Sequence, residues 1–328
     1  MKAQKLKEIF GMEPSFQSAA EKKRFQDALQ EHGLDPDVCY QEVEMDSTLV
    51  NTHTDITYEY ETMVLHSHDF YEIICCRSNC CVEYQVGPYR YVLQKGDIIL
   101  VRPGVSHCAI LPNPLILPYE RDIIWLSNAF LNSFHKILGL PPASYEKDQD
   151  TYLIRTADTP WEFLCHMIHE GVQMEKKKQH SWQTLVLGNT LMVVSYLRQA
   201  YWSNNAQELE AETPDLLDEI IAYIELNYGK KLVMSEVAKN FFVSERTIST
   251  MFRKRLGVTF SQFLTQRRLI EAKSKIVKGL PLDIVAEQTG FADYSTFYRA
   301  FRKEFGSSPK QFRKNSTGQV TGEGFIVG

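Results

Sequence analysis

Three histidines and one glutamate in the first half of the chain have the types and spacing of a metal-binding set. His66, His68 and Glu72 are separated by even numbers of residues, so an unbroken strand would project all three side chains to one face. His107 follows on a later strand-like segment. Three imidazoles and one carboxylate suit Fe, Mn, Ni or Zn and leave positions open for a ligand. The sequence predicts that these four side chains converge.

A small organic ligand is the alternative occupant of the same place. The imidazoles and the carboxylate would then hydrogen-bond one another or the ligand, and aromatic side chains would form walls for a sugar or another metabolite. The aromatic candidates are Tyr58, Phe70, Tyr71, Tyr84 and Tyr89. We predict an effector site built from His66, His68, Phe70, Glu72, Tyr84 and His107.

Four cysteines lie close together around a predicted turn at 77–79. Cys75 and Cys76 precede the turn and Cys80 and Cys81 follow it, which would bring Cys76 near Cys80 across a hairpin. A thiol switch or a soft-metal site is one interpretation. Small buried cysteines in strands are the other.

A second candidate for chemistry is a segment near the C-terminus that occurs twice, at 238–263 and 286–312. Phe252 and Phe301, Gly257 and Gly306, and Phe263 and Phe312 lie 49 positions apart. Each copy reads as a short helix, a turn and a second helix with a polar, basic outer face. A helix of this kind enters a DNA groove, so the repeat predicts two DNA-reading units.

The spacing of the second helices separates inward from outward residues. Ile248, Met251 and Phe252 face inward in the first copy, after Ser244 as N-cap, and Phe297, Ala300 and Phe301 do so in the second, after Asp293. Early outward positions lie deepest in a major groove and predict base contacts by Arg246, Ser249, Thr250, Ser295, Tyr298 and Arg299. Later basic positions predict phosphate contacts by Arg253, Lys254, Arg302, Lys303 and Lys310. Simple solvation of a basic helix face is the alternative.

Charge is distributed unevenly along the 328 residues. Residues 213–328 carry 18 Lys and Arg against 12 Asp and Glu, a net charge of +6, whereas residues 1–212 carry a net charge of −11. This asymmetry is expected when only the last part meets nucleic-acid phosphates. A hydrophobic fraction of 44%, seven cysteines and the absence of a secretory or membrane-spanning apolar run predict a globular cytoplasmic protein with no membrane partner.

Composition changes along the chain predict a multi-domain protein of α and β structure. Residues 1–39 are expected to form a helical extension and residues 40–203 an effector-binding and dimerisation region, with strands in a barrel or sandwich to about 127 and helices from about 128 to 203. Residues 204–213 form a polar linker, residues 214–315 an all-α domain with a long helix over 260–278 between the two repeat copies, and residues 316–328 a flexible tail.

The repeat resembles the signature of the AraC/XylS family of transcription regulators. Gly290-Phe291, Phe301-Arg302-Lys303, Gly306, Ser308-Pro309 and Phe312-Arg313 carry the likeness, which covers 214–313. It implies two helix-turn-helix units, joined by a long helix, that read adjacent major-groove segments of double-stranded promoter DNA. Phe241 stands where the second copy has Gly290, and a Phe does not readily adopt a positive φ, so the first turn is expected to differ in geometry.

The first part resembles a cupin barrel and the ligand-binding domain of many members of the same family. His66 to Glu72, Gly96-Asp97, Pro103 to His107 and 118–127 carry this likeness, although six residues rather than five separate Gly96 from Pro103. Together the resemblances imply a homodimeric activator that responds to a small effector and works with the transcription machinery. The competing interpretation is a metal-dependent cupin enzyme, or a metal or redox sensor, fused to a DNA-binding module. No catalytic residue is assigned, and the only cofactor considered is the divalent metal.

Overall fold

The computed structural model describes residues 45, 47–60, 65–79, 81–139, 152–204 and 215–318. The expected helical extension at 1–39, the linker beyond residue 204, Cys80 and most of the expected tail therefore lie outside the described residues. The described chain forms two compact units. One, the sheet unit, comprises 45–223 and 246–259, and the other, the helical unit, comprises 224–245 and 260–318.

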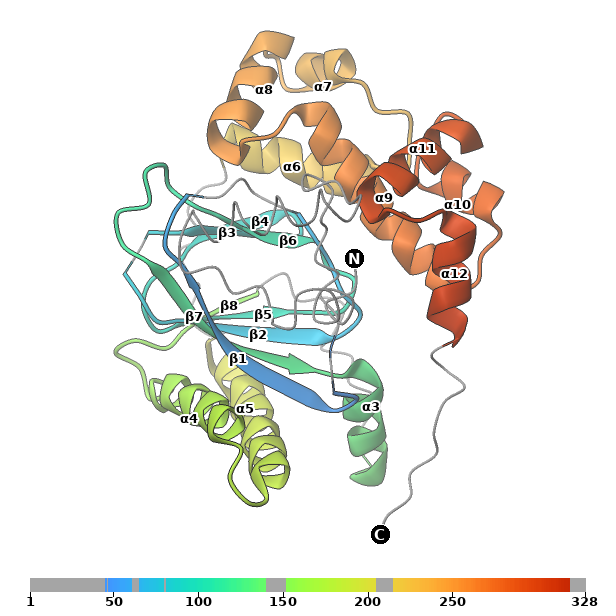
Figure 1. Ribbon diagram of the computed structural model, residues 1–328. Helices are drawn as coiled ribbons and strands as arrows, with labels where there is room; N and C mark the ends of the chain where they lie inside the picture. The colour runs from blue at the N-terminus through green and yellow to red at the C-terminus, as the bar shows by residue number, and fades with distance from the viewer. Residues whose placement is uncertain are drawn as a thin grey trace, which may run out of the picture. The chain divides into compact units, whose positions relative to one another are not determined.

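Two antiparallel sheets form the centre of the sheet unit (Figure 1). The larger sheet has the order β1-β7-β2-β5-β8. Its strands are β1 (Val50–Thr57), β7 (Tyr119–Leu126), β2 (Tyr71–Cys76), β5 (Asp97–Val101) and β8 (Leu153–Arg155). The smaller sheet has the order β4-β3-β6, with β4 (Tyr89–Val92), β3 (Glu83–Val86) and β6 (His107–Ile110). The described strands thus form two separate sheets, and neither closes on itself.

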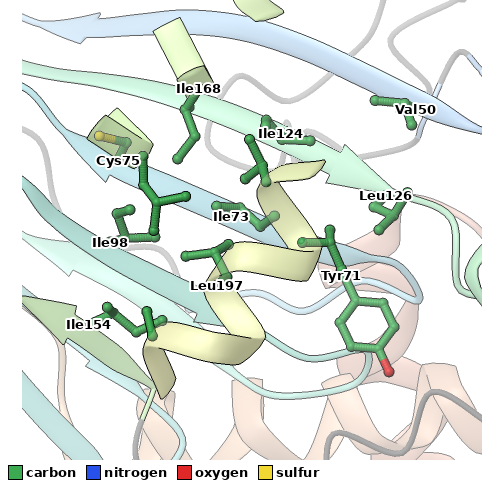
Figure 2. Packing of buried hydrophobic residues seen from close by; sticks show 14 of the residues in the cluster. Val50, Tyr71, Ile73, Cys75, Ile98, Ile124, Leu126, Ile154, Ile168 and Leu197 are labelled. Atoms are coloured by element: carbon green, nitrogen blue, oxygen red, sulfur yellow. The ribbon is translucent and has the colours of Figure 1, made fainter. Parts of the chain in front are cut away.

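Alternation along the central strands divides the core into two layers. On β2, Ile73 and Cys75 face the helices. Ile74 lies on the opposite face of the strand and packs in a cluster with Tyr84 of β3 and with Val82, which directly precedes β3. Apolar side chains on both faces explain why β2 is buried at every position. Figure 2 shows the helix-side layer, in which residues of β2 and β7 contact residues of two helices.

Two long helices cover the outer face of the larger sheet (Figure 1). These are α4 (Phe163–Lys177) and α5 (Trp182–Asn204), and α3 (Asn128–Ile137) follows β7, with the Ser127 hydroxyl accepting a hydrogen bond from the Phe130 N–H at its N-cap. The expectation that the chain is helical from about 128 onward is wrong at β8. Leu153 and Ile154 are buried there because they pair with β5 and extend the sheet, a long-range contact that local periodicity does not reveal.

Polar contacts fasten α4 to the sheet. The Glu175 carboxylate accepts hydrogen bonds from the Thr52 N–H at 2.6 Å and from its hydroxyl at 2.8 Å. The fully buried Asp122 carboxylate accepts from Thr54 at 2.6 Å and lies 3.0 Å from the His169 ring nitrogen. Because Glu175 occupies a backbone donor of β1, it also covers part of this edge strand.

Helices form the remainder of the described chain. They are α6 (Leu216–Asn227), α7 (Met234–Asn240), α8 (Glu245–Met251), the π-helical η2 (Phe252–Leu256), α9 (Phe260–Val277), α10 (Leu282–Gln288), α11 (Tyr294–Phe305) and α12 (Pro309–Gly318). Helix α9 is the long helix predicted from the sequence, and Gly279 follows it with a φ of 84°. No described helix has both the length and the apolar character needed to span a lipid bilayer.

The two repeat copies differ by one residue in the turn. Thr289 ends α10 and Gly290 follows at a φ of 79°, while Phe241 ends α7 and Phe242 follows at a φ of 54°. The residue equivalent to Gly290 is therefore Phe242, and the alignment of Gly290 with Phe241 is wrong because the first turn is shorter. Phe242 is 96% exposed, so its side chain meets no obstacle, although the left-handed backbone still costs roughly 1–2 kcal/mol.

Candidate effector site and nucleic-acid interface

The cluster predicted from the histidines and the glutamate is present between the sheets. The His107 Nε2 atom lies 3.0 Å and the His68 Nε2 atom 3.3 Å from Glu72 Oε2. Nitrogen and oxygen atoms of His66, Glu72 and His107 lie within 4.8 Å of one another. His68 contacts Glu72 but is outside this group of three.

Turn geometry, and not the expected strand parity, brings these side chains together. Strand β2 begins only at Tyr71, and His66 is joined to His107 by an isolated bridge with backbone hydrogen bonds of 2.9 and 3.1 Å. The His68 ring stacks on Phe70, with 3.9 Å between the ring centroids. The irregular segment before β2 therefore positions His66 and His68, while β2 and β6 position Glu72 and His107.

Both nitrogens of His68 and of His107 face acceptors. His68 Nδ1 lies 2.9 Å from the Phe70 carbonyl oxygen, and His107 Nδ1 lies 2.9 Å from the Val105 carbonyl oxygen. A neutral imidazole carries one N–H and can donate to only one of its two acceptors. Each histidine that donates to its carbonyl therefore points an Nε2 lone pair at the Glu72 carboxylate.

Burial and hydrogen bonding shift the pKa values of the cluster. Burial alone would raise the pKa of Glu72, but the adjacent His107 and His68 side chains outweigh it and hold this pKa well below its usual value. The pKa of His68 is lowered, mainly by burial. Burial also raises the pKa of Tyr84, whose ring centroid lies 6.4 Å from that of His107. Glu72 is thus a buried anion.

Sequence reasoning missed two residues of this cluster on β7. Trp125 is the cross-strand neighbour of Glu72, and its indole N–H donates to Glu72 Oε1 at 2.8 Å. Arg121 lies on the same face of β7 as Trp125 and contacts Asp55, its cross-strand neighbour on β1, at 2.8 Å. The alternation of Tyr119, Arg121, Ile123 and Trp125 was the available signal, because one face of β7 must line the space between the sheets.

The predicted DNA-contacting residues lie on α8, η2 and α11, with Lys310 on α12. Arg246, Thr250, Arg253, Lys254, Ser295, Arg299, Arg302, Lys303 and Lys310 are exposed, and Ser249 and Tyr298 are half-buried. Ile248, Phe252, Phe297 and Phe301 are buried, as expected for the inward face. At the start of α11, the Asp293 carboxylate accepts a hydrogen bond from the Thr296 N–H at 2.6 Å, which confirms the predicted N-cap.

The basic side chains of this region fall into two groups: those that pair within the fold, and those without a side-chain partner among the described residues. Arg267 pairs with Glu225 at 2.6 Å, and Arg268 donates to the carbonyl oxygens of Tyr228 and Lys230, each at 2.9 Å. By contrast, six of the predicted contacts make no side-chain hydrogen bond or ion pair among the described residues. These six are Arg246, Arg253, Lys254, Arg302, Lys303 and Lys310.

Comparison with known proteins gives the class of protein. Residues 237–315 match the family described as Helix-turn-helix domain. The HTH-type transcriptional activator RhaR of Yersinia pseudotuberculosis serotype O:1b (strain IP 31758) is 27% identical over 265 residues, which cover 78% of this chain and 87% of RhaR. The HTH-type transcriptional regulator YfiF of Bacillus subtilis (strain 168) is 26% identical over 268 residues, or 79% of this chain and 81% of YfiF.

A solved structure, ToxT from Vibrio cholerae O395, covers 83% of this chain and 100% of its own, with 15% identity and a TM-score of 0.34. The helix-turn-helix match, together with relatives that align over most of their length, indicates a DNA-binding transcription regulator rather than an enzyme. Residues 237–315 thus form an AraC-type helix-turn-helix domain, and the chain is similar over most of its length to the regulator RhaR.

Proposed function

We propose that this regulator activates transcription by reading double-stranded promoter DNA with α8 and α11, under the control of a small effector bound between the sheets. The six unengaged cations carry the DNA part of the proposal. Their side chains are available for an external anion, whereas Arg267 and Arg268 serve the fold. Arg246, Ser249, Thr250, Ser295, Tyr298 and Arg299 read bases, and Arg253, Lys254, Arg302, Lys303 and Lys310 neutralise phosphates.

The fine architecture that we propose is a cupin-like effector domain followed by two helix-turn-helix units that α9 joins, with domain limits at 40–203 and 214–315. Such a regulator acts in the cytoplasm and contacts the transcription machinery after it binds the promoter. It changes transcription if the effector favours one arrangement of the DNA-reading units over another.

DNA binding is tested with the duplex upstream of the chain's own coding sequence and a random duplex of equal length. Arg299→Ala should reduce the preference for the upstream duplex, because a bidentate base contact discriminates by about 1–3 kcal/mol. Arg302→Ala should weaken both complexes and make the slope of log affinity against log salt shallower by about 1. Arg198→Ala, at an exposed position of α5, is the matched control. Equal affinity for both duplexes with a flat salt dependence would overturn the proposal.

The effector that we propose is a polyhydroxylated metabolite such as a sugar. Supporting features are the paired Arg121 and Asp55 for polar groups and the Trp125, Tyr84 and Phe70 rings for apolar faces. A thermal-shift screen of sugars and organic acids should find a ligand that raises the unfolding midpoint. Trp125→Phe keeps an aromatic ring at this position but removes the indole donor to Glu72, so it should reduce that shift. Ligands that stabilise the wild type and this variant equally would contradict this location.

A divalent metal ion is a second candidate for the same cluster, and one observation favours it. His107 Nε2 is a buried atom without a hydrogen-bond partner among the described residues, although it lies 3.0 Å from Glu72. A cation between these atoms would satisfy the histidine lone pairs and the carboxylate together. Backbone carbonyls already fix the Nδ1 atoms of His68 and His107, as is usual for metal-ligating histidines. His66, Glu72 and His107 would hold the ion, with His68 beside them.

Elemental analysis of the purified protein tests the metal candidate. Stoichiometric Fe, Mn, Ni or Zn should be found in the wild type and lost in His107→Ala. His53→Ala is the matched control, because the His53 ring packs edge-on against the Trp125 ring, with 4.7 Å between centroids, and His53 is not one of the candidate ligands. Metal-free protein that still binds the effector would remove this candidate and leave the effector proposal intact.

A homodimer is also proposed, and the outer face of α5 supports it. Leu185 and Met192 are each 52% exposed and lie two helical turns apart on α5. A second copy would cover both side chains. Sedimentation equilibrium should show a dimer that Leu185→Asp with Met192→Asp converts to a monomer. A monomeric wild type at micromolar concentration would contradict the proposal.

A further inference from the structure

Two cysteines that are far apart in the sequence meet between the sheet and α4. Cys75 lies on β2 and faces the helix-side layer of the core, and Cys165 lies near the start of α4. The two side chains are neighbours, because Cys165 packs against the core cluster that contains Cys75, and Gly96, which Cys165 contacts, donates its N–H to the Cys76 carbonyl oxygen at 2.9 Å. Cys165 Sγ also lies 3.3 Å from the Thr156 hydroxyl and 3.3 Å from the Gly96 carbonyl oxygen. This pairing differs from the Cys76–Cys80 pairing that the sequence suggested.

The environment gives the two thiols different chemical roles. The adjacent Cys75 thiol lowers the pKa of Cys165 to about 7, and the Thr156 hydroxyl contributes in the same direction. The neighbouring Cys165 side chain, together with burial, raises the pKa of Cys75. Cys165 is half-buried, whereas Cys75 is buried. Cys165 is therefore the thiolate that meets a reagent first, and Cys75 is the neighbour that can resolve the product.

The other described cysteines lack this combination of features. Burial raises the pKa of Cys108. The Cys76 thiol donates to the Ser78 carbonyl oxygen at 3.3 Å. Cys81 is exposed and shares no hydrogen bond with another thiol of the described chain. Among the described cysteines, Cys75 and Cys165 are therefore the pair best placed to react with each other.

We propose that Cys75 and Cys165 form a peroxide-reactive dithiol that closes to an intramolecular disulfide. The Cys165 thiolate attacks one oxygen of a hydroperoxide, the O–O bond breaks, and an S–O bond forms to give a sulfenic acid and hydroxide, which takes up a proton. The Cys75 sulfur then attacks the Cys165 sulfur, loses its proton and displaces the oxygen as a second water. The two thiols lose two electrons in total, and hydrogen peroxide is reduced to two molecules of water.

The disulfide would connect β2 covalently to α4. Closing a long loop restricts the unfolded chain, so oxidation should raise the unfolding midpoint. It would also fix the contact between the larger sheet and its covering helices, beside the Asp122 and His169 contact. This site is independent of the proposed DNA and effector contacts, so its failure would leave those proposals untouched.

The test uses the full-length reduced protein and a small molar excess of hydrogen peroxide. After quenching, free thiols are blocked with N-ethylmaleimide, and the non-reduced digest is analysed by mass spectrometry. A peptide pair joined through Cys75 and Cys165 is expected, together with a higher unfolding midpoint that dithiothreitol reverses. In Cys75→Ser, oxidation should stop at the sulfenic or sulfinic acid of Cys165, because the resolving thiol is absent. Cys108→Ser is the matched control and should still form the disulfide.

Two outcomes would overturn the proposal, and both can be read from the wild type without any variant. In the first, Cys165 remains a free thiol, and is therefore fully alkylated by N-ethylmaleimide, at peroxide concentrations that oxidise the exposed Cys81. In the second, Cys165 is converted to sulfinic acid while Cys75 remains a free thiol.

Discussion

The two turn positions with positive φ, Gly290 and Phe242, show how single residues constrain the reading units. A Cβ atom at Gly290 would lie 2.4 Å from the Tyr228 carbonyl oxygen and 3.0 Å from the carbonyl carbon of Gly229. Both neighbours are backbone atoms of the loop that Arg268 fastens to α9. Only glycine fits this position without a shift of the backbone.

Gly290→Ala should lower the free energy of unfolding by about 3 kcal/mol, because it adds a steric clash to a strained backbone conformation. Gly306→Ala is the matched control, since Gly306 has a φ of 65° but a Cβ atom added there would meet no other side chain or backbone segment within 4 Å. Gly306→Ala should therefore lower the free energy of unfolding only by the cost of the left-handed backbone conformation, about 1 kcal/mol. Chemical denaturation of both variants measures the difference, and equal losses would show that the close approach to Tyr228 is unimportant.

At the scale of elements, α11 depends on its N-terminal cap as well as on its buried face. Phe297 and Phe301 pack in a core that α9, α10 and α12 complete. Asp293 adds the cap, because its carboxylate accepts hydrogen bonds from the Thr296 N–H at 2.6 Å and the Thr296 hydroxyl at 3.1 Å. Together they fix the face on which Ser295, Tyr298 and Arg299 are presented.

Asp293→Ala should lower the unfolding midpoint at neutral pH and weaken DNA binding. The hydrogen bond with the Thr296 N–H lowers the pKa of Asp293, so the folded state favours the anion. The stabilisation is therefore present above the ordinary aspartate pKa and is lost as the pH falls through the lowered value. Midpoints of the variant and the wild type should converge as acid is added. Asp283→Ala, in the first turn of α10, is the control and should show a smaller difference.

At the scale of the whole molecule, one ion-pair cluster joins three stretches of the sheet unit that are distant in sequence. Arg90 on β4 contacts Glu83 at 2.6 Å, Asp215 at 2.9 Å and Asp218 at 2.7 Å. Arg255 of η2 contacts Asp215 and also lies 3.5 Å from Glu83. Charges on the smaller sheet, at the start of α6 and at the end of the first reading helix thus depend on one another.

Arg90→Ala should lower the free energy of unfolding by about 2 kcal/mol, because it leaves three carboxylates close together with only Arg255 to compensate them. Arg246→Ala removes an exposed arginine without a partner among the described residues and should cost little by comparison. Thermal unfolding of the full chain in low and high salt measures both. The cost of Arg90→Ala should shrink in high salt, and a loss no larger than that of Arg246→Ala would exclude a role of the cluster in stability.

Much of the helical part could be predicted from sequence because its information is local. Buried residues such as Ile248, Phe297 and Phe301 recur at helical spacing, and Gly279 marks the end of α9. The predicted cap at Asp293 is present for the same reason. The repeat also indicated the class of regulator that the comparisons support, since a helix-turn-helix is specified by a continuous stretch of chain.

The sheet unit required the tertiary structure, because its contacts join residues far apart in the chain. Sequence composition selected His66, Glu72 and His107, but only the turn before β2 and the bridge to β6 decided how they meet. Periodicity did not identify β8, because this strand pairs with β5, which lies more than fifty residues earlier in the chain. The partner of Cys75 is on α4 for the same reason. Local pattern determined which residues face inward, and packing of distant elements determined which of them touch.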